Sequence, residues 1–240
     1  MLVPGQMNGL LFVYVCLITA GINNLLKNVW NDGTKGHINW LYTRKYTGKM
    51  KKEEIRSFYK EKRVTLTPQA KLKLSDLLLI QFQRLEIDIP SLIMTYSPIK
   101  SLNEFDPQTI TDYCYFKNPG QQLFYPVMVE GKGHPKLMSV IVDDETTFRV
   151  NKYGIEEPID GIDMFQTEID MVIVPLLCFD KKGNSVGYGK GYYDRFLKHC
   201  RKDCLKIGFS YFDPVDAIDD INKFDVKLDY GLTPDAIYQF

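Results

Sequence analysis

The sequence contains few of the residues that most nucleophile and metal motifs require. Among its 240 residues there are three histidines and five cysteines, and no two cysteines form a CxxC pair. An odd number of cysteines without such pairs argues against a disulfide framework. The histidines show no metal-ligand spacing around Cys200 and Cys204, and no Ser-His or Cys-His nucleophile is evident. Free cysteines are typical of a reducing compartment, so we expect a cytoplasmic protein.

The chain also lacks a net charge. Its 30 Lys and Arg residues are balanced by 30 Asp and Glu residues, which removes the global electrostatic argument for a nucleic-acid partner. Apolar residues make up 45% and charged residues 25%, which is a typical globular balance. The length is sufficient for one sizeable core.

No hydrophobic stretch is long enough to cross a membrane as a helix. The apolar segment GLLFVYVCLITAG covers residues 9–21, whereas a membrane-spanning helix needs ~20 apolar residues. No basic residue precedes it, as a signal peptide would require. We therefore interpret residues 1–49 as an extension from a misassigned start, with the true start at Met50. A genuine anchor or targeting segment is the alternative, although we expect no membrane association.

Helical and strand patterns alternate from Met50 onward. Thr67-Pro68 provides an N-cap and a first helical residue, and the nearly continuous apolar run at 169–179 is typical of a central strand buried on both faces. The alternation predicts a three-layer α/β fold, Rossmann-like, with a mostly parallel sheet flanked by helices. We expect helices near residues 51–63, 68–86, 107–116 and 193–202, and strands near 91–97, 122–129, 136–142, 169–179 and 205–211.

A glycine-rich stretch follows the central predicted strand. In GNSVGYGKGYYDRFL, residues 183–197, glycines at alternate positions surround Lys190. Glycine lets a backbone approach a ligand closely and adopt positive φ, and a lysine just before a helix N-terminus suggests a bound phosphate. The spacing is not that of a Walker A motif, because Gly191 follows the lysine where Walker A has Ser or Thr. It is not GxGxxG either, because the glycines are spaced GxGxG. From spacing alone, a plain turn remains the alternative.

The longer string VPLLCFDKKGNSVGYGKGYYDRFL, residues 174–197, resembles the signature of the 5-formyltetrahydrofolate cyclo-ligase family, also called methenyltetrahydrofolate synthetases. That signature consists of VP, a short apolar stretch, FD, a GN turn and a G-x-GKGYYD core. Further similarities follow in order in KKEEIR at 51–56, YGIEEP at 153–158 and KFDVKLD at 223–229. The resemblance implies a single cyclo-ligase domain over residues 50–240.

The resemblance also implies an activity. Such enzymes use ATP and Mg²⁺ to convert 5-formyltetrahydrofolate into 5,10-methenyltetrahydrofolate, releasing ADP and phosphate. The formyl oxygen is phosphorylated, N10 of the same folate attacks, and phosphate leaves. In phosphoryl transfer, the protein contributes mainly positioning of the reactants and stabilisation of charge. We expect a monomer with folate and ATP as its partners. A folate- or nucleotide-binding protein without turnover, or another small-molecule kinase on the same scaffold, are the alternatives.

The resemblance assigns Lys190 a catalytic role among the ATP phosphates. Lys52 and Arg56 lie four residues apart, hence on one helix face, and they are either phosphate contacts or solvated surface charges. Tyr193 lines the folate side of the loop or belongs to the core. The full set of implied ATP contacts is Lys52, Arg56, Gly187, Tyr188, Gly189, Lys190, Gly191, Tyr192 and Tyr193.

Mg²⁺ commonly takes one or two carboxylates together with phosphate oxygens and water. The resemblance assigns these carboxylates to Asp194 and Asp225, with Asp229 as a rival for the second. The alternative role of Asp194 is a first-turn acid that complements the helix dipole. The implied folate contacts are Met94, Glu104 and Tyr192.

Two departures from the family pattern concern the loop. Tyr188 stands where some relatives carry a basic residue, and 176–178 (Leu-Leu-Cys) replaces a smaller, glycine-containing stretch. These departures bear on how the loop packs more than on the type of reaction.

Overall fold

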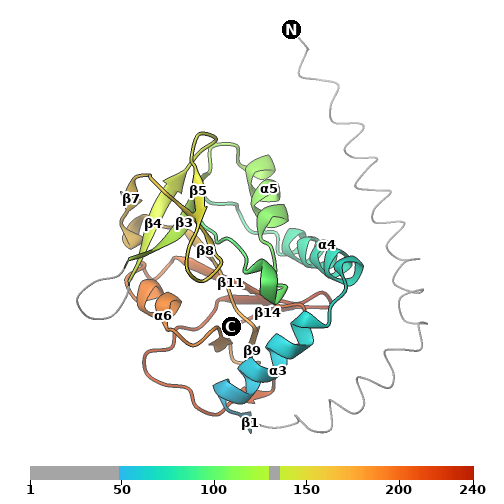
Figure 1. Cartoon of the computed structure of the whole chain (residues 1–240). Helices are drawn as coiled ribbons and strands as arrows, with labels where there is room; N and C mark the ends of the chain where they lie inside the picture. Colours follow the sequence, from blue (N-terminus) through green and yellow to red (C-terminus); the bar gives the residue numbers. More distant parts are fainter. Residues whose placement is uncertain (1–48, 130–135) are drawn as a thin grey trace, which may run out of the picture. The chain divides into compact units, whose positions relative to one another are not determined.

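The computed structural model describes residues 49–129 and 136–240, which belong to one compact unit, residues 48–240. The apolar segment 9–21 lies outside the described residues. Within the described ranges, no helix is both long and apolar enough to cross a membrane. Figure 1 shows a central sheet with helices packed around it. In spatial order its strands are β14 (Ile237–Gln239), β13 (Tyr230–Leu232), β11 (Leu205–Phe209), β8 (Met171–Val174), β2 (Leu92–Met94), β3 (Gln122–Val129), β4 (Lys136–Val142) and β7 (Asp163–Met164).

The centre of this sheet is parallel and buried on both faces. Strands β13, β11, β8, β2 and β3 pair in parallel, whereas β14, β4 and β7 pair antiparallel at the two edges. Alternate residues of β8 contribute to two different core clusters: Met171 and Ile173 to one, Val172 and Val174 to the other. Since successive strand residues point to opposite faces, this strand has a core on each side. The predicted α/β fold with a mostly parallel sheet is confirmed.

Helices cover both faces of the sheet. Leu78 and Phe82 of α4 (Pro68–Arg84) and Ile110 of α5 (Gln108–Lys117) are buried in the first core cluster. Phe196 and Leu197 of α6 (Tyr192–Leu197) are buried in the second. The first described helix is α3 (Lys52–Val64), and the described part of the chain also contains the 3-10 helices η1 (Lys100–Leu102) and η2 (Gln166–Glu168).

Local signals account for most helix ends. The Thr67 hydroxyl accepts a hydrogen bond from the amide of Ala70 at 3.2 Å, which confirms the predicted N-cap. Helix α4 ends at Arg84, two residues earlier than predicted, and Glu86 adopts a left-handed φ of 51°. The predicted helix 193–202 is too long, because α6 ends at Leu197 and the chain continues in tighter turns, with the Cys200 amide bonding the Leu197 carbonyl.

The predicted continuous strand 169–179 is wrong, and proline explains the error. Strand β8 ends at Val174, and Pro175 has no N–H with which to continue the ladder. The apolar residues after it form the separate two-residue strand β9 (Cys178–Phe179), which pairs with β10 (Ser185–Val186). The other short pairs are β1 (Lys49–Met50) with β12 (Ala217–Ile218), and β5 (Phe148–Val150) with β6 (Glu156–Pro158).

The FD and GN parts of the sequence string have a structural role in the turn between β9 and β10. The fully buried Asp180 accepts hydrogen bonds from the amides of Lys182 and Asn184, both at 2.9 Å, and from the amide of Ile218 at 3.2 Å. The Asn184 side chain donates to the same carboxylate. Gly183 completes the turn with a φ of 84°. One buried carboxylate thus fixes the base of the loop that contains Gly187, Gly189 and Gly191, called the glycine loop below.

Replacing Asp180 with alanine is therefore expected to lower the free energy of unfolding by roughly 3 kcal/mol, because buried N–H groups lose their acceptor. Urea denaturation followed by circular dichroism measures this change. Asp216→Ala is the matched control, because its half-exposed carboxylate forms an ion pair with Lys181 at the surface, and it should leave the unfolding curve nearly unchanged. Equal effects of the two changes would contradict the structural role of Asp180.

Candidate active site

A cavity of about 720 Å³ opens where strands β2 and β8 end. Ser97 follows β2 and Pro175 follows β8, and both line the cavity. The chain passes from β2 to β3 on one side, whereas β8 and β11 lie on the other side of β2. Ligands of open α/β sheets bind at such a switch point, beyond the carboxyl ends of the strands. The fold alone therefore marks this cavity as the candidate site.

The cavity brings together nearly all of the residues singled out from the sequence. Met94 and Asp229 are the exceptions, and the side chain of Met94 is fully buried in the core. Pro126, Met128 and Leu137, from β3 and β4, line an apolar part of the wall instead. The lining residues that the sequence predicted are Lys52, Arg56, Glu104, Gly187, Tyr188, Gly189, Lys190, Gly191, Tyr192, Tyr193, Asp194 and Asp225.

The glycine loop needs its glycines at two positions. Gly189 and Gly191 have φ angles of 90° and 65°, which side chains rarely tolerate. A Cβ on Gly189 would also lie 3.0 Å from Cζ of Arg56. Gly187 has no positive φ, and its carbonyl accepts a hydrogen bond from Nε of Arg56 at 3.0 Å. Helix α3 therefore holds the start of the loop, while Gly191 forms the N-cap of α6.

The large residues that replace the family's glycine-containing stretch are accommodated inside the protein. Leu176 and Cys178 are buried, with 1% and 0% of their surface exposed. A Cβ on Gly208 of β11 would lie 2.4 Å from Cδ2 of Leu176. The absence of a side chain at Gly208 thus provides the space that Leu176 fills.

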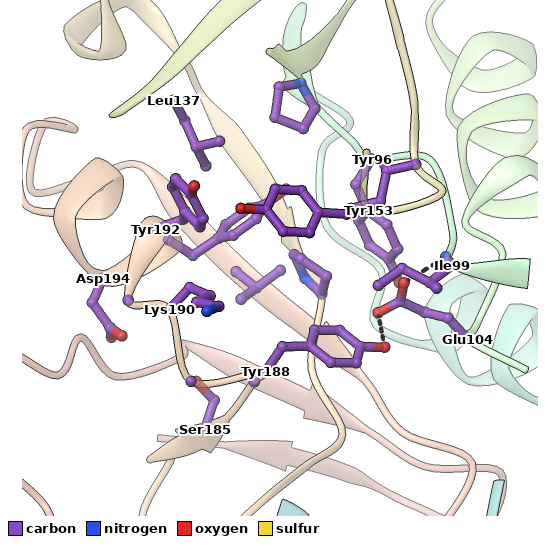
Figure 2. Close-up of a pocket in the computed structure, with 18 of the residues that line it drawn as sticks. Tyr96, Ile99, Glu104, Leu137, Tyr153, Ser185, Tyr188, Lys190, Tyr192 and Asp194 are labelled. Atoms are coloured by element: carbon purple, nitrogen blue, oxygen red, sulfur yellow. Dashed lines mark hydrogen bonds between the residues drawn. The ribbon is translucent and has the colours of Figure 1, made fainter. Parts of the chain in front are cut away.

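Charged groups gather at one end of the cavity. The ammonium of Lys52 contacts Oδ2 of Asp225 at 2.5 Å, and both side chains are only 11% exposed. Lys190 is exposed at the rim, and within the described part of the chain its ammonium makes no hydrogen bond or ion pair. Figure 2 shows Lys190 and Asp194 on the opposite side of the cavity from Glu104.

Asp194 and Asp225 are neighbouring carboxylates. Burial raises the pKa of Asp194, and the charge of Asp225 raises it further, against the lowering effects of the Val226 amide and Lys52. The Val226 amide donates to Oδ1 of Asp194 at 3.1 Å. Two adjacent carboxylates with hard oxygen donors fit a divalent cation. No group of three or more potential metal ligands occurs among the residues described, so such a cation would need further oxygens from phosphate or water.

Asp229 does not share this position. Its Oδ2 atom contacts the ammonium of Lys206 at 2.8 Å and accepts the Lys206 amide at 2.7 Å. It does not line the cavity. Of the two candidates for the second carboxylate, the geometry favours Asp225.

The opposite end of the cavity contains the buried carboxylate of Glu104, which is 1% exposed. It accepts hydrogen bonds from the Ile99 amide at 2.8 Å and from the Tyr188 hydroxyl at 2.7 Å (Figure 2). Burial raises the pKa of Glu104, and the charge of Arg63 opposes this rise. The nearby Tyr193 hydroxyl is buried and has no hydrogen-bond partner among the described residues. This end therefore combines an acceptor group with an unused hydroxyl.

Sequence reasoning did not find Arg63. Its guanidinium lies seven residues beyond Arg56 on the same helix and donates to the Leu176 carbonyl and to the Tyr188 hydroxyl. Helical periodicity could have found it, since 56 and 63 lie on one face. Tyr153 and Glu157, which belong to the YGIEEP segment, line the cavity although the sequence pattern assigned them no role.

Several known proteins are similar to this chain. A probable 5-formyltetrahydrofolate cyclo-ligase of Schizosaccharomyces pombe is 29% identical over 133 residues, covering 49% of this chain and 64% of the relative. A 5-formyltetrahydrofolate cyclo-ligase of Haemophilus influenzae is 33% identical over 94 residues, covering 38% and 50%. The chain thus matches less than two thirds of the length of either relative. The solved structure of an Aquifex aeolicus 5,10-methenyltetrahydrofolate synthetase superposes with a TM-score of 0.64 at 28% identity, covering 79% of this chain and 93% of that one.

The sequence model of the 5-formyltetrahydrofolate cyclo-ligase family matches residues 48–234. These residues include every strand that borders the cavity, the glycine loop and both charged ends. The chain belongs to the 5-formyltetrahydrofolate cyclo-ligase family.

Proposed function

We propose that the protein converts 5-formyltetrahydrofolate into 5,10-methenyltetrahydrofolate in an ATP- and Mg²⁺-dependent reaction that releases ADP and phosphate. The observation that carries this proposal is the two-ended cavity. A loop with one lysine and two neighbouring carboxylates forms one end, and a buried acceptor carboxylate forms the other. Two substrates of different chemistry can therefore bind in a single space, as a direct transfer between them requires.

The charged end suits a nucleotide triphosphate. Lys190 would neutralise charge on the transferred phosphoryl group, and Arg56 would hold the loop in place through the Gly187 carbonyl. Asp194 and Asp225 would hold Mg²⁺, which, when bound, supplies positive charge to the phosphate oxygens. Lys52 is paired with Asp225 in this structure. It would be released to contact phosphate when the carboxylate binds the cation.

The other end suits the ring of a folate. Glu104 is held as an acceptor for ring N–H groups by donors from Ile99 and Tyr188. The buried Tyr193 hydroxyl offers a further hydrogen bond to a ligand. Exclusion of water from such a site strengthens these contacts and protects a reactive phosphorylated formyl group from hydrolysis. The formamide oxygen is a poor leaving group until it is phosphorylated, after which N10 can close the ring.

The direct test is to incubate the protein with MgATP and 5-formyltetrahydrofolate and to follow the absorbance of methenyltetrahydrofolate together with ADP release. Product should form in equal amount to ADP and only when both substrates and Mg²⁺ are present. Binding of either ligand without turnover would favour a binding protein, and ADP release with another acceptor only would favour a different small-molecule kinase. Either result would overturn the proposal.

We also propose that residues 1–49 are dispensable for this activity. A chain that begins at Met50 is expected to fold and to turn over at the rate of the full chain. Met50 keeps its pairing with Ile218, and its carbonyl accepts the Asp219 amide at 2.8 Å. The full chain assayed in parallel is the control. An insoluble or inactive shortened chain beside an active full chain would contradict this prediction.

A further inference from the structure

A path of hydrogen bonds connects the glycine loop with the carboxylate at the far end of the cavity. Tyr188 belongs to the loop by its backbone, between Gly187 and Gly189. Its hydroxyl reaches away from the charged end and lies 2.7 Å from Oε1 of Glu104 (Figure 2). On its other side, Nη1 of Arg63 lies 2.9 Å from the same hydroxyl oxygen. One side chain thus joins the two ends of the site.

The direction of these hydrogen bonds follows from the chemistry of the groups. A guanidinium has donors only, so the Tyr188 oxygen must accept from Arg63. The single hydrogen of the hydroxyl is then available for Glu104, which accepts it as a carboxylate. The Ile99 amide donates to the other carboxylate oxygen at 2.8 Å. Both oxygens of Glu104 are therefore oriented by protein donors, and each keeps lone-pair capacity for a ligand.

The partners are buried and have little freedom to rearrange. The side chains of Arg63 and Glu104 are 1% and 2% exposed, and their nearest charged atoms lie 3.9 Å apart. At that distance the Tyr188 hydroxyl forms the hydrogen-bonded bridge between them. The second amino group of Arg63 donates to the Leu176 carbonyl, so the guanidinium is itself held by the chain leading to the loop.

We propose that Tyr188, held by Arg63, is a positioning residue that orients Glu104 for the donor groups of the folate ring. This role rests on the proposed function. It differs from the ATP contact expected from the sequence, because the hydroxyl of Tyr188 bonds at the folate end. It is also particular to this chain's tyrosine, since a lysine or arginine at position 188 could donate to Glu104 but could not accept from Arg63.

The test is a double-mutant cycle of Tyr188→Phe and Glu104→Gln, measured by calorimetric titration with 5-formyltetrahydrofolate in the absence of ATP. Tyr188→Phe keeps the ring and removes only the hydroxyl. We expect it to raise the folate Kd roughly tenfold, as loss of a hydrogen bond to a charged group does. In the Glu104→Gln background the same change should alter the folate Kd by less than about twofold. The Kd of MgATP, titrated separately, should change less than the folate Kd.

Tyr115→Phe is the matched control, because Tyr115 is 60% exposed on α5 and does not line the cavity. It should leave both Kd values unchanged. Additive effects of Tyr188→Phe and Glu104→Gln would overturn the positioning role while leaving the proposed function standing. A larger loss for MgATP than for folate would also overturn it. If the wild-type protein binds no 5-formyltetrahydrofolate, the proposed function fails and this role fails with it.

Discussion

Replacing Lys190 with alanine is expected to lower turnover by roughly 10²–10³-fold at saturating MgATP, the usual loss for one preorganised electrostatic contact. The lysine lies in the loop between two left-handed glycines, and no carboxylate among the described residues neutralises its ammonium. Its charge is therefore available for a phosphate ligand. Methenyltetrahydrofolate formation, measured as initial rate against MgATP concentration, provides the value.

The fold of this variant should survive, because an exposed loop lysine supports little core packing. Thermal unfolding of Lys190→Ala should match that of the wild type within a few degrees. Lys202→Ala is the control, because Lys202 is exposed and does not line the cavity. It should retain full turnover. Near-normal turnover of Lys190→Ala at saturating MgATP would mean that the loop is a structural turn.

Replacing Asp194 with asparagine is expected to raise the Mg²⁺ concentration for half-maximal activity roughly tenfold or more, because the change removes a unit charge beside the cation. Asparagine keeps the shape of the side chain and an oxygen that can still accept the Val226 amide. Binding of 5-formyltetrahydrofolate without ATP should change little, since Glu104 is at the other end of the cavity. Mg²⁺ titrations of the rate at fixed ATP measure the effect.

Two further variants make this test specific. Asp225→Asn should shift the Mg²⁺ titration in the same direction as Asp194→Asn, whereas Asp229→Asn should leave it unchanged, because Asp229 is paired with Lys206 away from the cavity. An unshifted titration for Asp194→Asn would eliminate Asp194 as a ligand. A shift for Asp229→Asn equal to that for Asp225→Asn would reject the choice between the two aspartates.

Patterns in the sequence predicted the layers of the fold but not the residues at which individual strands end. The apolar run 169–179 correctly predicted a core strand, because successive residues such as Val172 and Ile173 face different layers. It could not indicate where the strand ends, because apolar character continues past Pro175 while the backbone ladder does not. Both the strand and the turn that follows it are buried, so hydrophobicity does not distinguish them.

The sequence predicted those candidate site residues that lie close together along the chain. Lys190 and Asp194 lie in one short string, whereas the partners of Glu104 come from distant segments: Arg63 lies 41 positions before it and Tyr188 lies 84 positions after it. Met94 was misjudged for a related reason. The end of β2 faces the core at this residue, and only the tertiary pairing of β2 with β3 and β8 determines which face that is.

The contacts of helix α3 have a consequence for biosynthesis. Arg56 bonds Gly187 across 131 positions, and Lys52 bonds Asp225 across 173. During translation, Lys52 and Arg56 of this helix are synthesised early, whereas their acceptors Asp225 and Gly187 are synthesised much later. Long-range pairing of this kind is slow and leaves intermediates exposed. If the charged end of the cavity binds nucleotide as proposed, a nascent chain would bind it only after Asp225 has been synthesised, near the end of the domain.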